Sequence, residues 1–517
     1  MPTIFPSSLS CRPSERRRSR LLAGFVFMAM LSAVAVPVIF VGGVADAVPS
    51  TLGPCAGDLT GTTFTLGGNC ATTAPILVPS TVDTVDGGNF TISATDAGGA
   101  QWNGGILTNA TAGQALNVQN LTIEGPAAGF QLCTQANNVL YGIWFNDASG
   151  SVNNVTVNHI FQFQNGAFGS CQTGRAIRAD GVTAARTVTI TNTVVEDYQK
   201  SGFEARQQMT MNVSNSTAGP PHEMRGLIAQ NAVSIVGATG TIANNTIHGS
   251  GDELPGVGGS TDGTGVLLYG AHDVTVDHNT ITGAGTNLGV AVAADTTNAV
   301  VSFNQIGRTS PDAPDPTGFG VVVDSPTVKL SPSELQPAQG PSTATLICNT
   351  FSGWNTNIIG AVQMSCTPLP NGTECVAYSA SVFSVEGGTA PFTWSVASGT
   401  LPPGLSFAAA DGSITGTPTT PGTFDFSVMV ADSSTPTLSA TQAQTIIIAP
   451  NCAPESTPTT EPPPTAAPTP GAVVASTIGE LPPTGSGTSA PVYLGLIILA
   501  LGSAAVIVTT KRRARHS

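Results

Sequence analysis

Three stretches of the chain decide its fold: Gly240-Thr-Ile-Ala-Asn-Asn-Thr-Ile-His-Gly249, His272-Asp-Val-Thr-Val-Asp-His-Asn-Thr-Ile-Thr-Gly283 and Ala299-Val-Val-Ser-Phe-Asn-Gln-Ile-Gly307. Each alternates apolar with polar residues and turns at an asparagine, which is typical of short strands that meet at tight corners. Similar stretches lie upstream, from Leu116 onward. A second kind of strand lies between them and opens on a glycine, at Gly142, Gly174, Gly202, Gly265, Gly289 and Gly320.

These units recur about every 30 residues, the length of one turn of a parallel β-solenoid. One turn has too little apolar area to fold alone, so stacked turns must bury a continuous aliphatic column. Asparagine at a recurrent corner can adopt the left-handed conformation, and stacked asparagines can form a ladder. The pattern resembles the right-handed parallel β-helix of the pectate-lyase-like superfamily, which we assign to residues 48–368. A β-sandwich is the alternative, but its hairpin turns such as Asn-Gly are scarce here.

A different β segment occupies residues 369–452. It contains Gly387-Gly-Thr-Ala-Pro-Phe-Thr-Trp394 and Gly422-Thr-Phe-Asp-Phe-Ser-Val-Met-Val-Ala-Asp432, with Trp394 as a predicted core residue. These motifs resemble the immunoglobulin-like, cadherin-like sandwich of bacterial surface proteins. The predicted fold class is therefore all-β, a parallel β-helix followed by a small β-sandwich. The resemblance implies a spacer or binding module.

Related sandwiches bind calcium between domains, and the candidate ligands here are Glu386, Asp411 and Asp432. The alternative is that these are solvated surface carboxylates, since no dense acidic run is present. Apart from calcium, we expect no cofactor.

The beginning of the chain has the order of a secretory signal peptide. Arg16, Arg17, Arg18 and Arg20 precede an apolar stretch, and Ala45-Asp46-Ala47 offers a small-residue cleavage site. We therefore expect residues 1–47 to be removed on export. An uncleaved N-terminal anchor is the alternative, because the apolar stretch is long for a signal.

The end of the chain resembles the cell-wall sorting signal of Gram-positive surface proteins. The motif residues are Leu481, Pro482, Pro483, Thr484 and Gly485. An apolar run of about 17 residues follows, long enough in a helix to cross about 26 Å of a hydrocarbon core of roughly 30 Å. A basic tail ends this segment, residues 481–517.

The resemblance implies that a sortase joins Thr484 to peptidoglycan after transient membrane insertion of the C-terminal helix. An ordinary membrane anchor with a chance motif is the alternative. Residues 453–480 are rich in proline and threonine and are expected to form an extended linker through the wall. The protein is thus expected to be secreted and cell-wall anchored, on the extracellular face.

Composition fits an exported protein. Only 9% of the 517 residues are charged, and the formal net charge is -14, so nucleic acid is not an expected partner. Eight cysteines remain after loss of Cys11, and none has zinc-site spacing. Nearest-neighbour disulfides are expected among many possible connectivities: Cys55 with Cys70, Cys133 with Cys171, Cys348 with Cys366, and Cys375 with Cys452.

Alignment of the turns on their opening glycine predicts one outward stripe of aromatic and charged groups. It collects Trp144, Asn146, Arg178, Glu204, Arg206 and Tyr269, and later turns place Ala291, Ala293 and Val322 there. Aromatic rings can stack on sugar faces while Arg and Glu bond hydroxyls or carboxylates, so the stripe suits a glycan. The alternative is a surface ion-pair network of Arg178, Glu204 and Arg206. Arg175 falls in an inward position in this alignment.

A catalytic set is not legible. Asp252, Glu253 and Asp262 lie on a glycine-rich insertion and, with Glu204 and Arg206, are weak candidates for acid–base work on a glycosidic bond. The insertion is more simply a solvated bulge between turns. Two functions remain open: a wall-anchored adhesin or glycan-binding protein for environmental or host polysaccharide, which we favour, and a surface-displayed polysaccharide hydrolase or lyase.

Overall fold

The computed structural model describes residues 48–96, 102–130, 139–162, 173–220, 230–249, 263–282, 288–308, 318–324, 342–354, 356–380 and 383–451. The predicted signal peptide, proline-rich linker and sorting signal lie outside these residues. Within the described ranges, no helix has the length and apolarity needed to cross a membrane.

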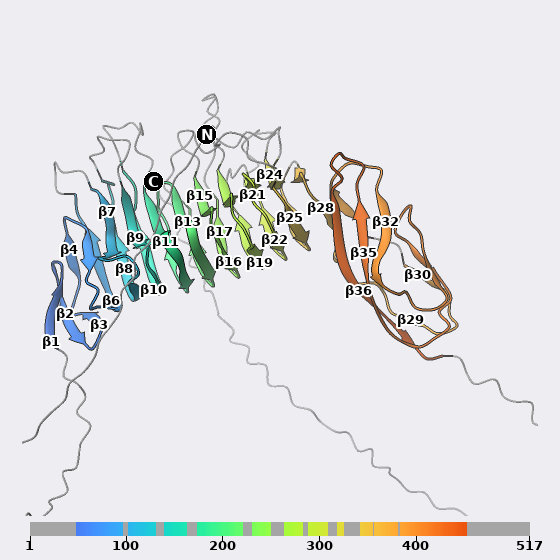
Figure 1. Ribbon diagram of the computed structural model, residues 1–517, viewed down its shortest axis with the longest axis horizontal. Helices are drawn as coiled ribbons and strands as arrows, with labels where there is room; N and C mark the ends of the chain where they lie inside the picture. Colours follow the sequence, from blue (N-terminus) through green and yellow to red (C-terminus); the bar gives the residue numbers. More distant parts are fainter. Residues whose placement is uncertain are drawn as a thin grey trace, which may run out of the picture. The chain divides into compact units, whose positions relative to one another are not determined.

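The first described domain is a stack of parallel strands with three faces, and Figure 1 shows its coils following one another from blue to olive. The first face contains β5 (Ile76–Val78), β7 (Gly104–Asn109), β9 (Leu140–Asn146), the beginnings of β11 (Arg175–Thr191) and β13 (Ser201–Ser214), β15 (Asn231–Val236), β18 (Thr264–Tyr269), β21 (Leu288–Ala293), β24 (Phe319–Val323) and β27 (Thr356–Ile359).

The second face contains β6 (Thr84–Ala94), β8 (Ala115–Glu124), β10 (Ser149–Asn158), the ends of β11 and β13, β16 (Thr239–Ala243), β19 (Val274–Asp277), β22 (Ala299–Ser302) and β25 (Ala344–Ile347). The third face contains β4 (Cys70–Thr72), the ends of β6, β8 and β10, β12 (Val194–Val195), β14 (Thr217–Ala218), β17 (Thr246–His248), β20 (Thr280–Thr282), β23 (Gln305–Gly307) and β26 (Thr350–Ser352). The predicted parallel β-helix is therefore confirmed, and the β-sandwich alternative is wrong for this part of the chain.

Antiparallel strands close the N-terminal end of the stack. β1 (Val48–Leu52), β2 (Cys55–Thr60) and β3 (Thr63–Leu66) form a meander, and β3 then pairs in parallel with β6. The meander covers strand edges that an open stack would present to other chains.

The inward residues form one continuous apolar core, as the alternating pattern predicts. Equivalent positions on neighbouring coils stack in register, for example Ile143 on Ile177 and Phe203 on Val233. All the predicted inward residues of the first face are buried, namely Ile143, Phe145, Ile177, Phe203, Val266 and Leu268. Each coil therefore gains its apolar burial from its neighbours rather than from itself.

In the coils from Asn192 to Cys348, each corner between the second and third faces combines two different positions. The first residue is left-handed, as in Asn244 (φ 57°) and His278 (φ 51°). The residue after it has a buried side chain that continues a ladder, as Asn245 and Asn279 do. In the ladder, the N–H of Asn245 (2.9 Å) and its Nδ2 (3.0 Å) both donate to Asn279 Oδ1. The same contacts link Asn279 to Asn304 and continue down the stack.

The ladder ends on a longer amide. Asn349, the last asparagine, donates its N–H and Nδ2 to Oε1 of Gln363, and Gln363 Nε2 returns a bond to the Asn349 carbonyl at 2.8 Å. Because every buried amide in this run has partners, the ladder satisfies polar groups that would otherwise be costly to bury.

Some opening glycines of the first face have no room for a side chain, as Gly289 shows. A Cβ on Gly289 would lie 2.5 Å from the carbonyl oxygen of Gly320 and 2.4 Å from Ile306 Cγ2. Strand register places Ala176 and Ala232 at the same position in their coils. The alignment on Gly174 is therefore wrong by two residues in that coil.

The second domain is a mainly antiparallel sandwich built from two small sheets and a short strand pair. One sheet has the order β29 (Gly372–Thr373), β36 (Ser439–Ala449), β35 (Gly422–Ala431) and β32 (Thr393–Gly399). The other has β30 (Tyr378–Ala380), β34 (Ile414–Gly416) and β33 (Leu405–Phe407), and β28 (Val362–Met364) pairs with β31 (Val385–Gly387).

A separate apolar core fills the sandwich. Trp394 belongs to it, as predicted, and its ring stacks on that of Phe383 with centroids 5.7 Å apart. The core also takes in Val362 and Met364, which precede the sequence-based boundary at residue 369.

Candidate functional site

One buried carboxylate organises the outer side of the first face. Glu204, on β13, accepts hydrogen bonds from three arginines: Arg175 through Nε, Arg178 through Nη1 at 2.8 Å, and Arg206 through Nε at 2.6 Å. The Glu204 side chain is only 2% exposed, so its charge is compensated by arginines rather than by water. Arg178 lies beside Glu204 because neighbouring strands β11 and β13 place these positions in register.

Arg178 links this carboxylate to an aromatic partner. Its Nε and Nη2 donate to Asp180 at 2.9 and 2.7 Å, while Trp144 Nε1 donates to Asp180 Oδ2 at 2.7 Å. The Tyr141 ring meets the Trp144 ring edge-on at 5.3 Å, and the guanidinium of Arg178 lies 5.1 Å from the Tyr141 centroid. The side chains therefore form one connected platform of fixed geometry, with cation–π contact at its centre.

The charges of the platform do not cancel. Arg175, Arg178 and Arg206 face two carboxylates, Glu204 and Asp180, which leaves one positive charge in a chain whose formal net charge is -14. The Arg206 side chain is 39% exposed and uses only Nε in this network. Its two terminal nitrogens have no partner among the described residues and are available to a ligand.

The environment shifts several pKa values. Burial raises the pKa of Glu204, but Arg175, Arg178 and Arg206 outweigh burial and hold it far below its usual range. Burial lowers the pKa of Arg178, and the charge of Glu204 reverses that effect. Burial also raises the pKa of Tyr141. Glu204 is thus ionised at any physiological pH and has no proton to give to a leaving group.

A second carboxylate shapes the neighbouring turn. Asp147 accepts the N–H groups of Val182 and Thr183, the Thr183 hydroxyl, and Arg186 Nε. The bond from the Thr183 hydroxyl is the main reason that its pKa falls to about 2. These contacts hold the irregularity between Gly181 and Arg186, where β11 and β13 lose their common register.

The same outer face changes character farther along the stack. Leu267, Leu288, Ala291, Ala293 and Val322 form a small apolar cluster there, and Tyr269 packs against it. Ala291, Ala293 and Val322 do point outward, as the alignment predicts, yet they are buried.

The structure brings together four of the predicted stripe residues: Trp144, Arg178, Glu204 and Arg206. Tyr269 instead joins the apolar cluster. The weighed alternative of an ion-pair network describes the charged residues correctly, although Glu204 at its centre is buried. Arg175 lies on the outer side with them, and its inward assignment is wrong because strict alternation does not hold across Ala176: Arg175 and Arg178, three residues apart, both bond Glu204.

Sequence reasoning missed two members of the platform, Tyr141 and Asp180. Asp180 would have followed from a correct register, which places it opposite Asn146, whereas Tyr141 lies opposite Arg175 at the start of the strands, where alternation does not hold. Asp252, Glu253 and Asp262 lie outside the described residues, as do Leu481, Pro482, Pro483, Thr484 and Gly485.

The calcium candidates are not assembled into a site. Asp432 uses its carboxylate within the sandwich, accepting bonds from the N–H groups of Thr389 and Leu438 and from the Ser434 hydroxyl. Asp411 accepts the N–H of Ser413, and Glu386 lies on β31. Across the described ranges, no group of three or more His, Cys, Asp and Glu side chains could hold a metal ion.

Two disulfides are present among the described residues, Cys55–Cys70 and Cys348–Cys366. Cys375 is also disulfide-bonded. Its predicted partner Cys452, together with Cys133 and Cys171, lies outside the described residues.

Comparison with known proteins agrees with the two-domain architecture. Residues 175–331 match the family described as "Right handed beta helix region", and residues 362–449 match the one described as "Putative Ig domain". The chain combines a right-handed β-helix with an immunoglobulin-like domain. No curated protein matches the chain.

Several solved structures are similar to this chain at low identity. The periplasmic alginate epimerase AlgG is 11% identical over 58% of this chain and 61% of its own, with a TM-score of 0.30. The enzymatically active domain of bacteriophage CBA120 tailspike protein 2 is 11% identical over 74% and 66%, with a TM-score of 0.38. The A-module of mannuronan C-5 epimerase AlgE6 from Azotobacter vinelandii is 15% identical over 57% and 84%, with a TM-score of 0.26. This chain spans less than two thirds of the length of AlgG.

Proposed function

We propose that this chain is an exported surface protein that is joined to peptidoglycan through Thr484 and binds a glycan on the outer side of its β-helix without altering it. The sorting motif and the signal-like N-terminus support display on the cell wall. The arrangement around Glu204 supports binding rather than catalysis, and it is the observation on which the proposal depends.

Glycosidic bond cleavage needs one carboxyl group that can hold a proton and another that can act as base or nucleophile. Glu204 is locked in ion pairs with three arginines, and Asp180 is bonded to Arg178 and Trp144. Neither carboxylate on this platform is therefore available for that chemistry. The partly exposed guanidinium of Arg206, held by Glu204 on the platform that also carries Trp144 and Tyr141, instead suits recognition of a sugar chain.

Binding can be tested with the purified protein on an array of neutral and acidic polysaccharides, followed by titration of any hit. We expect Arg206→Ala to weaken binding by about tenfold or more, since a charge-assisted bond is lost. Thr187→Ala, an exposed change on the second face, is the matched control and should bind like the parent protein. Equal affinity of the Arg206→Ala variant would contradict the proposed site.

The enzymatic alternative has its own readout. Each polysaccharide that binds is incubated with the protein and assayed for new reducing ends and for unsaturated products. Turnover by the parent protein would replace the binding proposal with a hydrolase or lyase. Attachment is tested separately, by digesting cell walls and searching for the peptide that ends at Thr484 joined to a wall fragment. Its absence would contradict sortase-dependent anchoring.

A further inference from the structure

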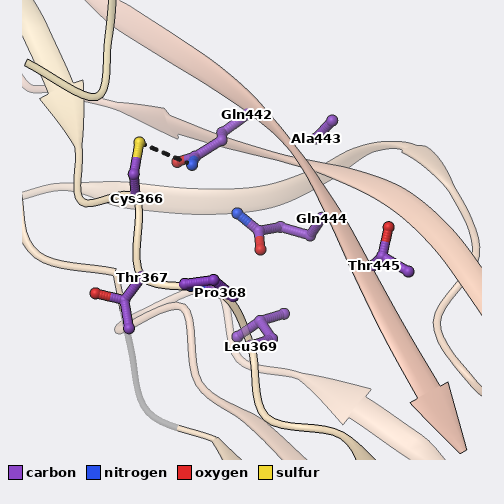
Figure 2. Close-up of a pocket in the computed structure, with 8 residues that line it drawn as sticks. All are labelled: Cys366, Thr367, Pro368, Leu369, Gln442, Ala443, Gln444 and Thr445. Atoms are coloured by element: carbon purple, nitrogen blue, oxygen red, sulfur yellow. Dashed lines mark hydrogen bonds between the residues drawn. The ribbon is translucent and has the colours of Figure 1, made fainter. Parts of the chain in front are cut away.

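The sandwich contains a cleft of about 280 Å³ between residues 366–369 and strand β36, whose lining residues are drawn in Figure 2. In that view, Gln442 and Gln444 project from β36 toward the facing segment, while Ala443 and Thr445 point away. No charged side chain lines the cleft.

The cleft is a gap where a parallel ladder stops. β29 pairs with the end of β36, with Gly372 opposite Ile448. The same offset sets Cys366 opposite Gln442, but among the described residues this upstream stretch forms no ladder with β36. Pro368 lies within the stretch, has no N–H and cannot donate to a ladder.

Both ends of the facing segment are fixed. Cys366 is disulfide-bonded to Cys348, and Gly372 belongs to the sheet. The segment therefore runs beside β36 between two anchor points, so the gap is part of the folded structure.

Two side-chain amides in the cleft have unused hydrogen-bonding capacity. Gln444 is only 7% exposed, and its side chain forms no hydrogen bond with any described residue. Gln442 donates Nε2 to the sulfur of Cys366 at 3.2 Å, a weak acceptor, and its buried Oε1 has no partner in the described parts of the chain. Polar groups buried in this way are costly unless something else completes their bonds.

The main chain of β36 adds to this row of polar groups. The N–H of Ile447 points to this side of the strand, because it donates to Asn371 Oδ1 at 3.4 Å. Successive residues of a strand direct their N–H and C=O groups to alternate sides. The N–H and C=O groups of Thr445 and Ala443 therefore face the cleft too.

We propose that this cleft binds a short extended peptide segment of another protein, which pairs with the free edge of β36. A peptide main chain alternates donors and acceptors along its length, as the edge and the two glutamine amides do. The uncharged lining makes recognition depend on the main chain. The volume of about 280 Å³ lies just below the usual range for ligand sites, about 300–1,000 Å³, so only a few residues of the peptide are held. This activity is independent of the glycan site on the β-helix.

The purified protein can be titrated by calorimetry with an acetylated, amidated hexapeptide of alternating threonine and valine. A second peptide has the same side chains with N-methyl groups on alternate amides, which removes the donors that pair with a strand edge. We expect the first peptide to bind and the second to bind at least about tenfold more weakly. No binding of the first peptide, or equal binding of both, would overturn the proposal.

Two substitutions at one exposed position place the binding on this edge. Ala443→Pro removes a cleft-facing N–H, whereas Ala443→Val keeps it. The proline variant should lose peptide binding by about tenfold or more, and the valine variant should keep it. Gln444→Met provides a second measurement that does not rest on the backbone, with an expected loss of about three- to tenfold. If binding survives both Ala443→Pro and Gln444→Met, the peptide binds elsewhere and the assignment is wrong.

Discussion

At the scale of single residues, Glu204 is the centre of the described polar platform. Its carboxylate accepts bonds from Arg175, Arg178 and Arg206 while almost fully buried. An ion pair in such surroundings contributes little net stability compared with an apolar replacement, but removal of one partner leaves the others buried without compensation. The platform is therefore sensitive to loss of the one group that all three arginines share.

Replacement of Glu204 by glutamine should lower the free energy of unfolding by about 3–5 kcal/mol, because Arg175 and Arg178 are left without their main counter-charge. Urea unfolding followed by circular dichroism measures the change. Arg206→Gln is the matched control, since Arg206 is partly exposed and its loss should cost about 1 kcal/mol or less. A Glu204→Gln variant as stable as the Arg206→Gln variant would show that the shared carboxylate does not hold the platform together.

The pKa shifts predict that acid destabilises the β-helix. Asp147, through its bond from Thr183, has its pKa lowered to about 2, and the arginines lower that of Glu204. Both groups bind protons more readily when unfolded, with ordinary pKa values of about 4, so their stabilisation is complete above that pH and is lost as the pH falls toward 2. The thermal midpoint should therefore fall between pH 5 and 2, and Asp147→Asn should flatten the curve. A midpoint that rises on acidification would contradict the assignment.

At the scale of elements, adjacent residues have different roles at the corner between the second and third faces: one adopts the left-handed conformation, and the next forms the hydrogen bonds between coils. The left-handed residue can be Asn244, His278 or even Phe303, because its side chain lies outside and only its backbone is constrained. Where the next residue is an asparagine of the ladder, its amide bonds the coils on both sides. Asn279 accepts from Asn245 and donates to Asn304.

Asn279→Ala should destabilise the stack by about 2–4 kcal/mol, because it leaves buried donors of Asn245 and a carbonyl of Ile242 without partners. His278→Asn is the control at the adjacent left-handed position and should be nearly neutral, since asparagine tolerates that conformation. Denaturant unfolding of the two variants gives the comparison. A similar cost for both would mean that the ladder amide has no special role.

The sequence predicted the fold better than the site, for physical reasons. Alternation and recurrent asparagines report burial and corners directly, so the β-helix and its inward residues followed from the pattern. The pattern did not distinguish the two corner positions, because both accept asparagine. Alternation failed at the start of β11, where Arg175 and Arg178 reach the same side although they lie three residues apart, so Arg175 was assigned to the wrong side. Outward direction also did not mean exposure, as the buried Leu267 shows. Only three-dimensional packing supplies that information.

At the scale of the whole molecule, two apolar cores are built on different principles. The core of the β-helix is a column in which each coil contacts its neighbours, and the core of the sandwich is a single closed cluster around Trp394. Separate cores of this kind are expected to unfold as separate cooperative units.

Differential scanning calorimetry should accordingly show two transitions. Trp394→Ala should destabilise the sandwich by about 3–5 kcal/mol and so lower the midpoint temperature of its transition, without shifting the transition of the β-helix. Ile177→Ala, at a buried position of the β-helix, should lower the midpoint temperature of the β-helix transition and leave that of the sandwich unchanged. If either substitution shifts both transitions together, the two domains unfold as one unit.

The Cys348–Cys366 bond has a mechanical consequence for any chain pulled from its two ends. Tension entering from the C-terminal side crosses the sulfur bridge and passes directly from residue 366 to residue 348. The 17 residues between them, which include the last ladder asparagine, Asn349, are therefore not under tension. Peeling of the stack from that side must therefore begin at the strand before the bridge, β25, and a reducing agent would add the spared stretch to the length that can be drawn out.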